Sequence, residues 1–443
     1  MFKKCHIGIQ QMNTTHDTTE DAILIVNQSL ELTGQVSLTG AKNAVLVIIA
    51  SLILTTGKSV LTNVPNSDDV LQMIILLREL GAYIIFDVLH NTLEIDTTAI
   101  SNFKISPTLM NKMRASVLVM GPLLARFSKA EVALPGGCTI GPRPIDFHIK
   151  NFEKMGVTYT LDGEFLTGTT RTLKATTLTL EYPSVGATEN LMMAATLTQG
   201  ITRIINASLE PEVLDLITAL IKMGSKISIV PPATILIEGV TQLNPIHHAI
   251  MHDRLEAGAL LLAAAITGGS IYLPDASSDL LDVFLLKLQE MGHTIEIGDQ
   301  GKGIRLIATK NPRAVSFTTA PYPGFPTDLQ APMMAAQCFA AGESQIHETV
   351  FENRFLHIRE LQKMGAQISI KGNRALITGV EMLYGTTVVA TDIRASCALV
   401  LAGLAAQGTT IMSGINHWKR GYDALEKKLA LLSASITLKK STD

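Results

Sequence analysis

A ten-residue segment at 135–144, PGGCTIGPRP, carries the most specific chemical pattern in the sequence. Its three glycines and three prolines are incompatible with a helix or a central strand, so we expect a surface loop with hinges at both ends. Cys138 lies within this loop, and Arg143 follows five residues later. A nearby cation lowers the pKa of a thiol, so we expect Cys138 to be reactive, as a proton donor or as a nucleophile. An ordinary loop cysteine is the alternative.

Lys42 is a second candidate, in the segment TGAKNAV at 39–45. Gly40 lets the backbone turn tightly before a helix, which places Lys42 near the helix N-terminus. Helix N-termini carry partial positive charge and free amides, so an added ammonium group makes a suitable anion site. A solvated lysine at a helix start is the alternative.

Four arginines occur singly in otherwise apolar surroundings, and each needs a carboxylate or a phosphate because arginine is rarely buried alone. They are Arg114, Arg354, Arg394 and Arg420. A local structural ion pair is the alternative for two of them, with Glu352 or Asp392 as the partner. Four such residues, far apart in the sequence, favour a shared anion site.

Asp328 lies in the segment PTDLQAP at 326–332, just after a proline-rich run. A carboxylate at a junction between loop and helix commonly caps the helix. The alternative is a general base, which needs a suitable pKa and must reach the hydroxyl group that it deprotonates.

The elements that position these residues come from a repeat of 68 to 75 residues. In each unit an amphipathic helix ends in a glycine and runs into an alternating strand, because a helix C-terminus often needs a left-handed residue. The residues at this position are Gly81, Gly156, Gly224, Gly292, Gly365 and, in the last unit, Ser433. Each unit also has a second helix that is small and apolar nearly all round, so we expect it to be buried.

Six such units predict an α/β fold with two pseudo-symmetric halves of three units each. Two halves need a cleft between them, and clefts between domains are favoured ligand sites. A repeat scaffold without chemistry is the alternative, since a fold does not dictate function.

Composition excludes several classes of protein. The 443 residues include 47% hydrophobic ones, but we find no apolar run long enough for a membrane span. A net charge of −3 gives no general attraction to nucleic acid or to an anionic membrane. The cysteines form no CxxC pair, which argues against disulfides and a zinc site and favours a reducing, cytoplasmic location. They are Cys5, Cys138, Cys338 and Cys397. We expect residues 1–24 to be a poorly ordered extension and not a secretory signal.

From about Ile25 onward, the chain resembles the enolpyruvyl transferase family, in the branch that acts on UDP-N-acetylglucosamine. The motifs occur in the family's order: TGAKNA, NVP, MRAS, LPGGCTIGPRP, PSVGATEN, EPE, PTDLQ, TVFENRF, ATDIRAS and RGY. The resemblance implies a two-domain, inside-out α/β barrel of six βαβαββ-type units, as in EPSP synthase. One domain would comprise 25–41 and 252–443, and the other 42–251 with the cysteine loop.

The resemblance also implies a reaction, in which the enolpyruvyl group of phosphoenolpyruvate passes to the 3′-hydroxyl of the UDP-sugar. A tetrahedral intermediate would form and lose phosphate, in the first committed step of peptidoglycan precursor synthesis. The resemblance calls for no metal, no cofactor and no obligate protein partner. From an exposed thiol beside cationic groups, we also predict that the epoxide fosfomycin alkylates Cys138.

Transferred by position, the resemblance gives roles to individual residues. Cys138, Asp328 and Lys42 would be catalytic, with Cys138 acting as an acid or in product release and Asp328 holding the attacking hydroxyl. The residues that would bind phosphoenolpyruvate are Lys42, Arg114, Arg143, Arg394 and Arg420. Those that would line the UDP-sugar site are Asn43, Arg114, Arg143, Pro144, Asp146, Phe147, His148, Ser184, Val185, Gly186, Asp328 and Val350.

Some positions depart from the family pattern. Asn66 and Asp68 follow NVP where relatives often carry lysines, and Leu209 replaces a basic residue before EPE. We expect these changes to affect the affinity for the UDP group and not the chemistry. The nearest alternative activity is enolpyruvyl transfer to shikimate 3-phosphate, but that branch typically has GDKS where this chain has GAKN, and lacks the cysteine loop. A silent paralogue that only binds UDP-sugars is a further alternative.

Overall fold

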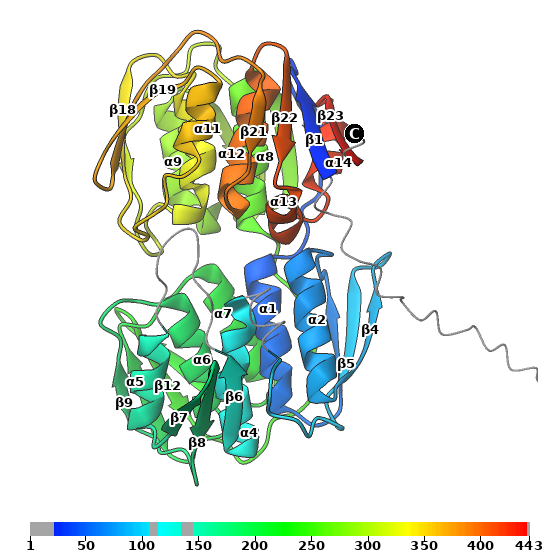
Figure 1. Ribbon diagram of the computed structural model, residues 1–443, viewed down its shortest axis with the longest axis vertical. Helices are drawn as coiled ribbons and strands as arrows, with labels where there is room; N and C mark the ends of the chain where they lie inside the picture. The colour runs from blue at the N-terminus through cyan, green and yellow to red at the C-terminus, as the bar shows by residue number, and fades with distance from the viewer. Residues whose placement is uncertain (1–21, 107–113, 134–144, 441–443) are drawn as a thin grey trace, which may run out of the picture.

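The computed structural model describes residues 22–106, 114–133 and 145–440, which are arranged as two stacked lobes (Figure 1). Each lobe has its own hydrophobic core. The core of the lower lobe runs from Ala41 to Ile250, whereas the upper lobe combines 22–38 with 255–434. The chain therefore crosses between the lobes twice, after Leu38 and after Ile250.

The described residues form six sheets, three in each lobe, that repeat one pattern. A short edge strand pairs in parallel with a second strand, and the next two strands pair antiparallel. In the sheet β6-β8-β7 an isolated parallel bridge from Lys104 to Glu131 takes the place of the edge strand. The repeat expected from the sequence is thus confirmed.

Most strands of the lower lobe alternate buried and more exposed side chains, as half-buried strands do, for example β5, β8 and β12. The strands of this lobe are β3 (Lys58–Thr62), β4 (Tyr83–Asp87), β5 (Thr92–Asp96), β6 (Lys129–Ala133), β7 (Thr158–Asp162), β8 (Phe165–Thr169), β9 (Thr177–Thr179), β10 (Ile201–Ile205), β11 (Lys226–Val230), β12 (Thr234–Glu238) and β13 (His247–Ala249). Strand β13 pairs with β3 and so closes this lobe.

The strands of the upper lobe follow the same plan. They are β1 (Ala22–Asn27), β2 (Thr33–Gln35), β14 (Ser270–Ser277), β15 (Thr294–Ile297), β16 (Lys302–Ile307), β17 (Phe317–Thr318), β18 (Glu343–His347), β19 (Gln367–Lys371), β20 (Arg374–Thr378), β21 (Thr387–Val389), β22 (Thr409–Ser413) and β23 (Ile436–Lys440). Strand β1 lies between β22 and β23. Ala22, Ile23 and Leu24 belong to this strand, and Leu24 is fully buried, so the last three residues of the expected extension 1–24 are part of the fold.

The outer helix of each unit ends as the sequence predicts. The glycine positions have φ between 93° and 110°, and Ser433 adopts 76°. These values lie in the left-handed region that a helix end uses. The outer helices are α2 (Asp68–Leu80), α5 (Asp146–Lys154), α7 (Pro211–Lys222), α9 (Asp282–Glu290), α11 (Ile358–Lys363) and α14 (Leu425–Leu431).

The second helix of each unit packs inside its lobe, as expected. Nearly every side chain of α8 is buried, and Gly258 lets Leu329 approach this helix, because a Cβ there would lie 2.7 Å from the leucine side chain. The inner helices are α1 (Lys42–Ser51), α4 (Met120–Phe127), α6 (Val185–Ala195), α8 (Arg254–Thr267), α10 (Gln330–Gln337) and α12 (Ile393–Ala405). Short 3₁₀ helices and α13 complete the structure: η1 (Leu52–Leu54), η2 (Arg114–Val119), η3 (Ser278–Leu280), η4 (Asp299–Gly301), η5 (Thr327–Leu329) and α13 (Ile415–Gly421). Within the described ranges, no helix is both long and apolar enough to cross a bilayer.

Candidate active site

Three of the charged candidates, together with Arg254, lie at equivalent positions of the repeat, at the starts of inner helices. Lys42 begins α1, Arg254 begins α8, Arg394 is the second residue of α12, and Asp328 lies in η5 just before α10. The N-terminal ends of helices carry partial positive charge, so this arrangement suits anionic ligands. Ion pairs place the starts of α1 and α8 at the interface between the lobes, because Lys42 shares Asp69 with Arg420 and Arg254 contacts Glu212.

Asp69 joins two of the candidate cations across the lobe interface. Its carboxylate accepts a hydrogen bond from Lys42 Nζ at 3.2 Å and another from Arg420 Nε at 2.8 Å. Asp69 and Lys42 belong to the lower lobe, whereas Arg420 lies in α13 of the upper lobe. Burial alone would raise the pKa of Asp69, but Lys42 and Arg420 outweigh it and hold this pKa below its usual value. Lys42 and Arg420 thus face one anionic group.

Asp328 lies between two arginines. Arg354 donates to one carboxylate oxygen at 2.6 Å, and Arg394 donates to the other at 2.8 Å. Burial opposes ionisation, but Arg394, Arg354 and, more weakly, Lys42 hold the pKa of Asp328 far below its usual range. Asp328 is therefore an anion.

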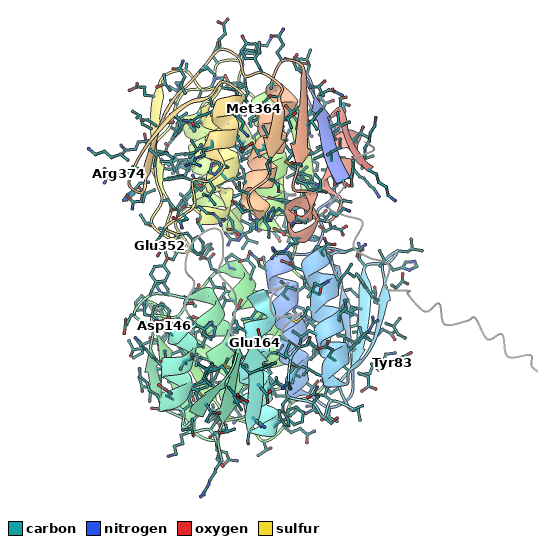
Figure 2. The ribbon with its side chains drawn as sticks, in the orientation of Figure 1. Tyr83, Asp146, Glu164, Glu352, Met364 and Arg374 are labelled. Carbon is teal, nitrogen blue, oxygen red and sulfur yellow. The ribbon has the colours of Figure 1, made fainter. Side chains whose placement is uncertain are left out.

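Two alternatives for these residues are wrong. Asp328 makes no capping hydrogen bond, because both of its oxygens face arginines and it lies inside η5. The arginines do not pair locally either. The Asp392 side chain instead caps α12 by accepting from the backbone amides of Arg394 and Ala395. Glu352 is exposed at the lower edge of the upper lobe (Figure 2).

Neighbouring side chains fix the geometry around Asp328. Arg394 also donates to the hydroxyl of Tyr422, at 3.1 Å. Glu348 accepts from the hydroxyl of Thr327, at 2.9 Å, and from the backbone amide of Val350, at 2.8 Å. The loop that carries Val350 is thereby tied to the segment that carries Asp328.

Arg254 forms a second bridge between the lobes. Its guanidinium contacts Glu212 at 3.0 Å and Glu210 at 2.7 Å, and Glu210 also accepts from the backbone amide of Tyr322. The sequence analysis missed Arg254 and both carboxylates as partners, as it missed Asp69. The sequence does hold a signal for the contact between Arg254 and these two glutamates. Arg254 stands at the start of the long apolar helix α8, and a buried charge there needs a partner.

The candidates for the UDP-sugar site gather at the starts of α5 and α6. His148 is buried, and its Nδ1 lies 3.0 Å from the side-chain nitrogen of Asn190. A Cβ at Gly186 would lie 3.7 Å from the His148 ring, so the two segments are in close contact. The Ser184 side chain caps α6 through the amide of Ala187.

The remaining lower-lobe candidates of this group lie nearby or outside the described part. Asp146 and Phe147 open α5 and are half-buried, and one oxygen of Asp146 is buried without a hydrogen-bond partner among the described residues (Figure 2). Val185 begins α6 and is partly exposed. Asn43 is exposed beside Lys42, and Arg114 begins η2. Three candidates lie outside the described residues, namely Cys138, Arg143 and Pro144.

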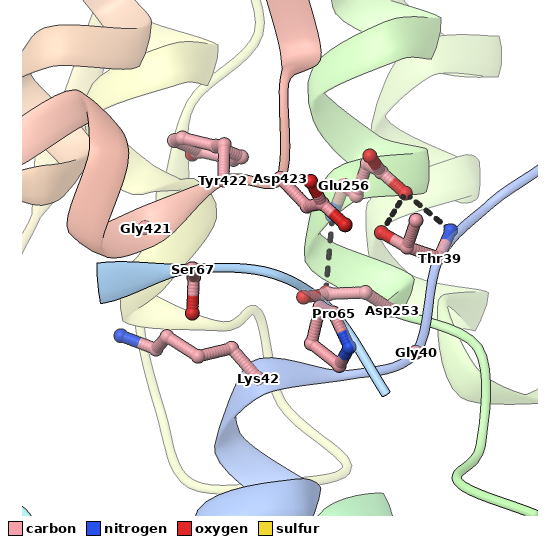
Figure 3. Close-up of a pocket in the computed structure, with 10 residues that line it drawn as sticks. All are labelled: Thr39, Gly40, Lys42, Pro65, Ser67, Asp253, Glu256, Gly421, Tyr422 and Asp423. Carbon is pink, nitrogen blue, oxygen red and sulfur yellow. Dashed lines mark hydrogen bonds between the residues drawn. The ribbon is translucent and has the colours of Figure 1, made fainter. Parts of the chain in front are cut away.

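A small pocket lies between the lobes beside Lys42 (Figure 3). Residues from the start of α1, from the segment before α2, from the start of α8 and from the end of α13 form its walls. They are Thr39, Gly40, Lys42, Pro65, Ser67, Asp253, Glu256, Gly421, Tyr422 and Asp423. Gly40 is required for close packing, because a Cβ there would lie only 1.8 Å from the carbonyl oxygen of Asn63.

Comparisons with known proteins agree with this arrangement. The family model described as EPSP synthase (3-phosphoshikimate 1-carboxyvinyltransferase) matches residues 26–429. A UDP-N-acetylglucosamine 1-carboxyvinyltransferase of Geotalea uraniireducens is 45% identical over 413 residues, which cover 93% of this chain and 98% of the relative. The enzyme of the same name from Dichelobacter nodosus is 47% identical over 405 residues, or 91% of this chain and 96% of the relative.

Solved structures show the same fold at lower identity. The enolpyruvyl transferase NikO from Streptomyces tendae superimposes with a TM-score of 0.86 at 22% identity, over 95% of this chain and 99% of that chain. EPSP synthase from Acinetobacter baumannii gives a TM-score of 0.73 at 16% identity, over 94% and 99% of the two chains. The fold, the matched family model and the long alignments agree, and the chain belongs to the EPSP synthase family of enolpyruvyl transferases.

Proposed function

We propose that this enzyme transfers the enolpyruvyl group of phosphoenolpyruvate to the 3′-hydroxyl of UDP-N-acetylglucosamine and releases phosphate. The observation that carries the proposal is the identity of 45% and 47% with enzymes of that name over nearly the whole chain. The charges at the lobe interface support it, because both substrates are polyanions and need concentrated cations.

Phosphoenolpyruvate is assigned to the side of the interface where Lys42 and Arg420 share Asp69. Its phosphate and carboxylate would bind these cations together with Arg143, while Arg114 and Arg394 complete the positive field. Since Asp69 already neutralises Lys42 and Arg420, the substrate must take over contacts that a carboxylate of the protein makes in its absence. Asp69 is thus an internal counterion of the binding site.

The UDP-sugar is assigned to the lower-lobe surface formed by the starts of α5 and α6, with Asn43, Val350 and Asp328 near its reacting end. Asp328 faces the interface as a carboxylate held between Arg354 and Arg394. A carboxylate with so low a pKa accepts a hydrogen bond well but binds a proton poorly. Its first role is therefore to orient the 3′-hydroxyl, and it takes the proton as the new C–O bond forms.

The reaction balances as an addition followed by an elimination. The methylene carbon of phosphoenolpyruvate gains a proton from Cys138 while the sugar oxygen bonds to the adjacent carbon. The tetrahedral intermediate then loses phosphate by cleavage of the bond between this carbon and the phosphate oxygen, and the methyl group returns a proton to the Cys138 thiolate as the double bond forms again. The cations at the interface stabilise the negative charge through both steps.

This activity would supply the cytoplasmic synthesis of peptidoglycan precursors. It uses no metal and no cofactor in the proposed scheme. Shikimate 3-phosphate is the acceptor to test against, because the matched family model is described as EPSP synthase.

The test measures phosphate release from phosphoenolpyruvate with UDP-N-acetylglucosamine, with shikimate 3-phosphate, and without an acceptor. We expect release only with the UDP-sugar, and we expect Lys42→Ala to abolish it. Release only with shikimate 3-phosphate would overturn the assignment. Tight binding of the UDP-sugar without any release would instead show a silent paralogue.

A further inference from the structure

Ser67 lies at the lobe interface with a hydroxyl group that the fold does not satisfy. The residue is 1% exposed, and its Oγ has no hydrogen-bond partner among the described residues. Ser67 is the N-cap residue of α2, yet its side chain makes no capping hydrogen bond. A buried hydroxyl without a partner costs free energy, so its presence calls for a physical reason.

The hydroxyl of Ser67 faces the pocket beside Lys42. Both residues line this pocket, and Figure 3 shows the Ser67 hydroxyl directed toward the Lys42 side chain. The pocket adjoins the first turn of the thirteen-residue helix α2, which carries Asp68 and Asp69, and Asp69 is the present partner of Lys42 Nζ. The serine hydroxyl and the lysine side chain therefore border the same space.

The carboxylates that line the pocket are already bound elsewhere. Asp253 caps α8 through backbone amides, and Glu256 accepts from Lys428 Nζ at 2.7 Å. Asp423 accepts from the backbone amide of Asn66 at 2.9 Å. None of these contacts uses the Ser67 hydroxyl, so an incoming ligand remains the group that could satisfy it.

We propose that Ser67 is a further substrate-binding residue, whose hydroxyl donates a hydrogen bond to a phosphate oxygen that also accepts from Lys42. The inference rests on the proposed function and assigns this phosphate to phosphoenolpyruvate. The diphosphate of the UDP-sugar has the same chemistry, and the experiment separates the two sources. On binding, the phosphate replaces Asp69 as the partner of Lys42, and the Ser67 hydroxyl gains the bond that it lacks.

The test compares Ser67→Ala with the unchanged enzyme in steady-state kinetics. A hydrogen bond to a charged group accounts for a factor of about ten or more in affinity, so KM for phosphoenolpyruvate should rise about tenfold. KM for UDP-N-acetylglucosamine should stay within about twofold. Inorganic phosphate, as a product inhibitor competing with phosphoenolpyruvate, should lose about the same factor.

Ser225→Ala is the matched control. Ser225 is also buried, at 6% exposure, and its Oγ likewise has no partner among the described residues. It follows the C-terminal end of α7, whereas the lobe interface lies at the N-terminal end of this helix. Removing the same oxygen here should leave both KM values unchanged.

Three results would overturn the role of Ser67. The first is an unchanged KM for phosphoenolpyruvate in Ser67→Ala, and the second is a rise in KM confined to the UDP-sugar. The third comes from calorimetric titration with phosphoenolpyruvate, where equal binding by the two proteins, or no binding by either, refutes the contact. Absence of phosphate release by the unchanged enzyme would refute the proposed function, and the titration would still test the role of Ser67.

Discussion

Replacing Asp69 by asparagine should lower the stability of the ligand-free enzyme and increase the stabilisation that phosphoenolpyruvate provides. The change removes the negative charge that lies 3.2 Å from Lys42 Nζ and 2.8 Å from Arg420 Nε. At an effective dielectric constant of about 20, each contact represents roughly 5 kcal/mol of attraction before the cost of desolvation is subtracted. Breaking a buried pair by removing one partner costs about 3–5 kcal/mol.

The lower end of this range applies to Asp69. Lys42 is buried, but the Arg420 side chain is 32% exposed, so solvent screens part of its interaction. We therefore expect Asp69→Asn to lose about 3 kcal/mol, which corresponds to a fall of roughly 6–12 °C in Tm for a lobe of this size. Phosphoenolpyruvate should restore most of the loss, because its anionic groups replace the missing carboxylate.

Thermal unfolding with and without phosphoenolpyruvate measures both effects. Asp215→Asn is the control, since Asp215 also accepts from a buried partner, His248 Nε2 at 3.0 Å, and its other hydrogen bond, from the backbone amide of Met251, involves none of the candidate cations. It should lower Tm without any recovery on adding phosphoenolpyruvate.

The pH dependence provides a second check. The pKa of Asp69 is lowered in the folded state, so its contribution is complete above the unfolded value of about 3.9 and is lost as pH falls through the lower, folded value. The stability difference between the unchanged enzyme and Asp69→Asn should shrink below about pH 4. Equal stabilisation of both proteins by phosphoenolpyruvate at pH 7 would refute the counterion role.

Two further predictions concern the residues that would contact phosphoenolpyruvate. Arg420→Ala should raise KM for phosphoenolpyruvate by about tenfold or more and KM for the UDP-sugar far less, because a charged hydrogen bond to the former is lost; equal increases in steady-state kinetics would contradict this contact. Cys138→Asp should retain part of the activity, because a carboxylic acid also delivers a proton, and mass spectrometry should find fosfomycin attached to Cys138 of the unchanged enzyme. Complete loss of turnover in Cys138→Asp would exclude the acid role, and an active enzyme without the adduct would exclude the reactive thiol.

The repeat could be derived from the sequence because its determinants are local. A left-handed residue at a helix end and the alternation of the following strand are each set by fewer than a dozen neighbouring residues. The glycines from Gly81 to Gly365 therefore marked the units correctly, and even Ser433 adopts the same backbone region. Burial of the inner helices followed from their small apolar side chains in the same way.

The partners of the charged residues could not be derived in this way. Local spacing suggested Glu352 for Arg354, but the partner is Asp328, which is 26 residues away in the sequence. Asp69 and Arg420 are 351 residues apart, and they meet only because two separately folded lobes face each other. Ion pairs of this kind depend on the three-dimensional arrangement of the units, which a single sequence does not encode in any local pattern.

The path of the chain through the two lobes has a consequence for folding during translation. The lower lobe is one continuous stretch of chain, so it can complete its core while the ribosome is still adding the rest. In the upper lobe, β1 needs β22 and β23, whose residues are made about 400 positions later. During translation β1 therefore stays without its partner strands, and its apolar side chains stay exposed, until β23 leaves the ribosome. This lobe is therefore expected to fold after the lower one, and truncation near the C-terminus should leave a folded lower lobe attached to an unfolded partner.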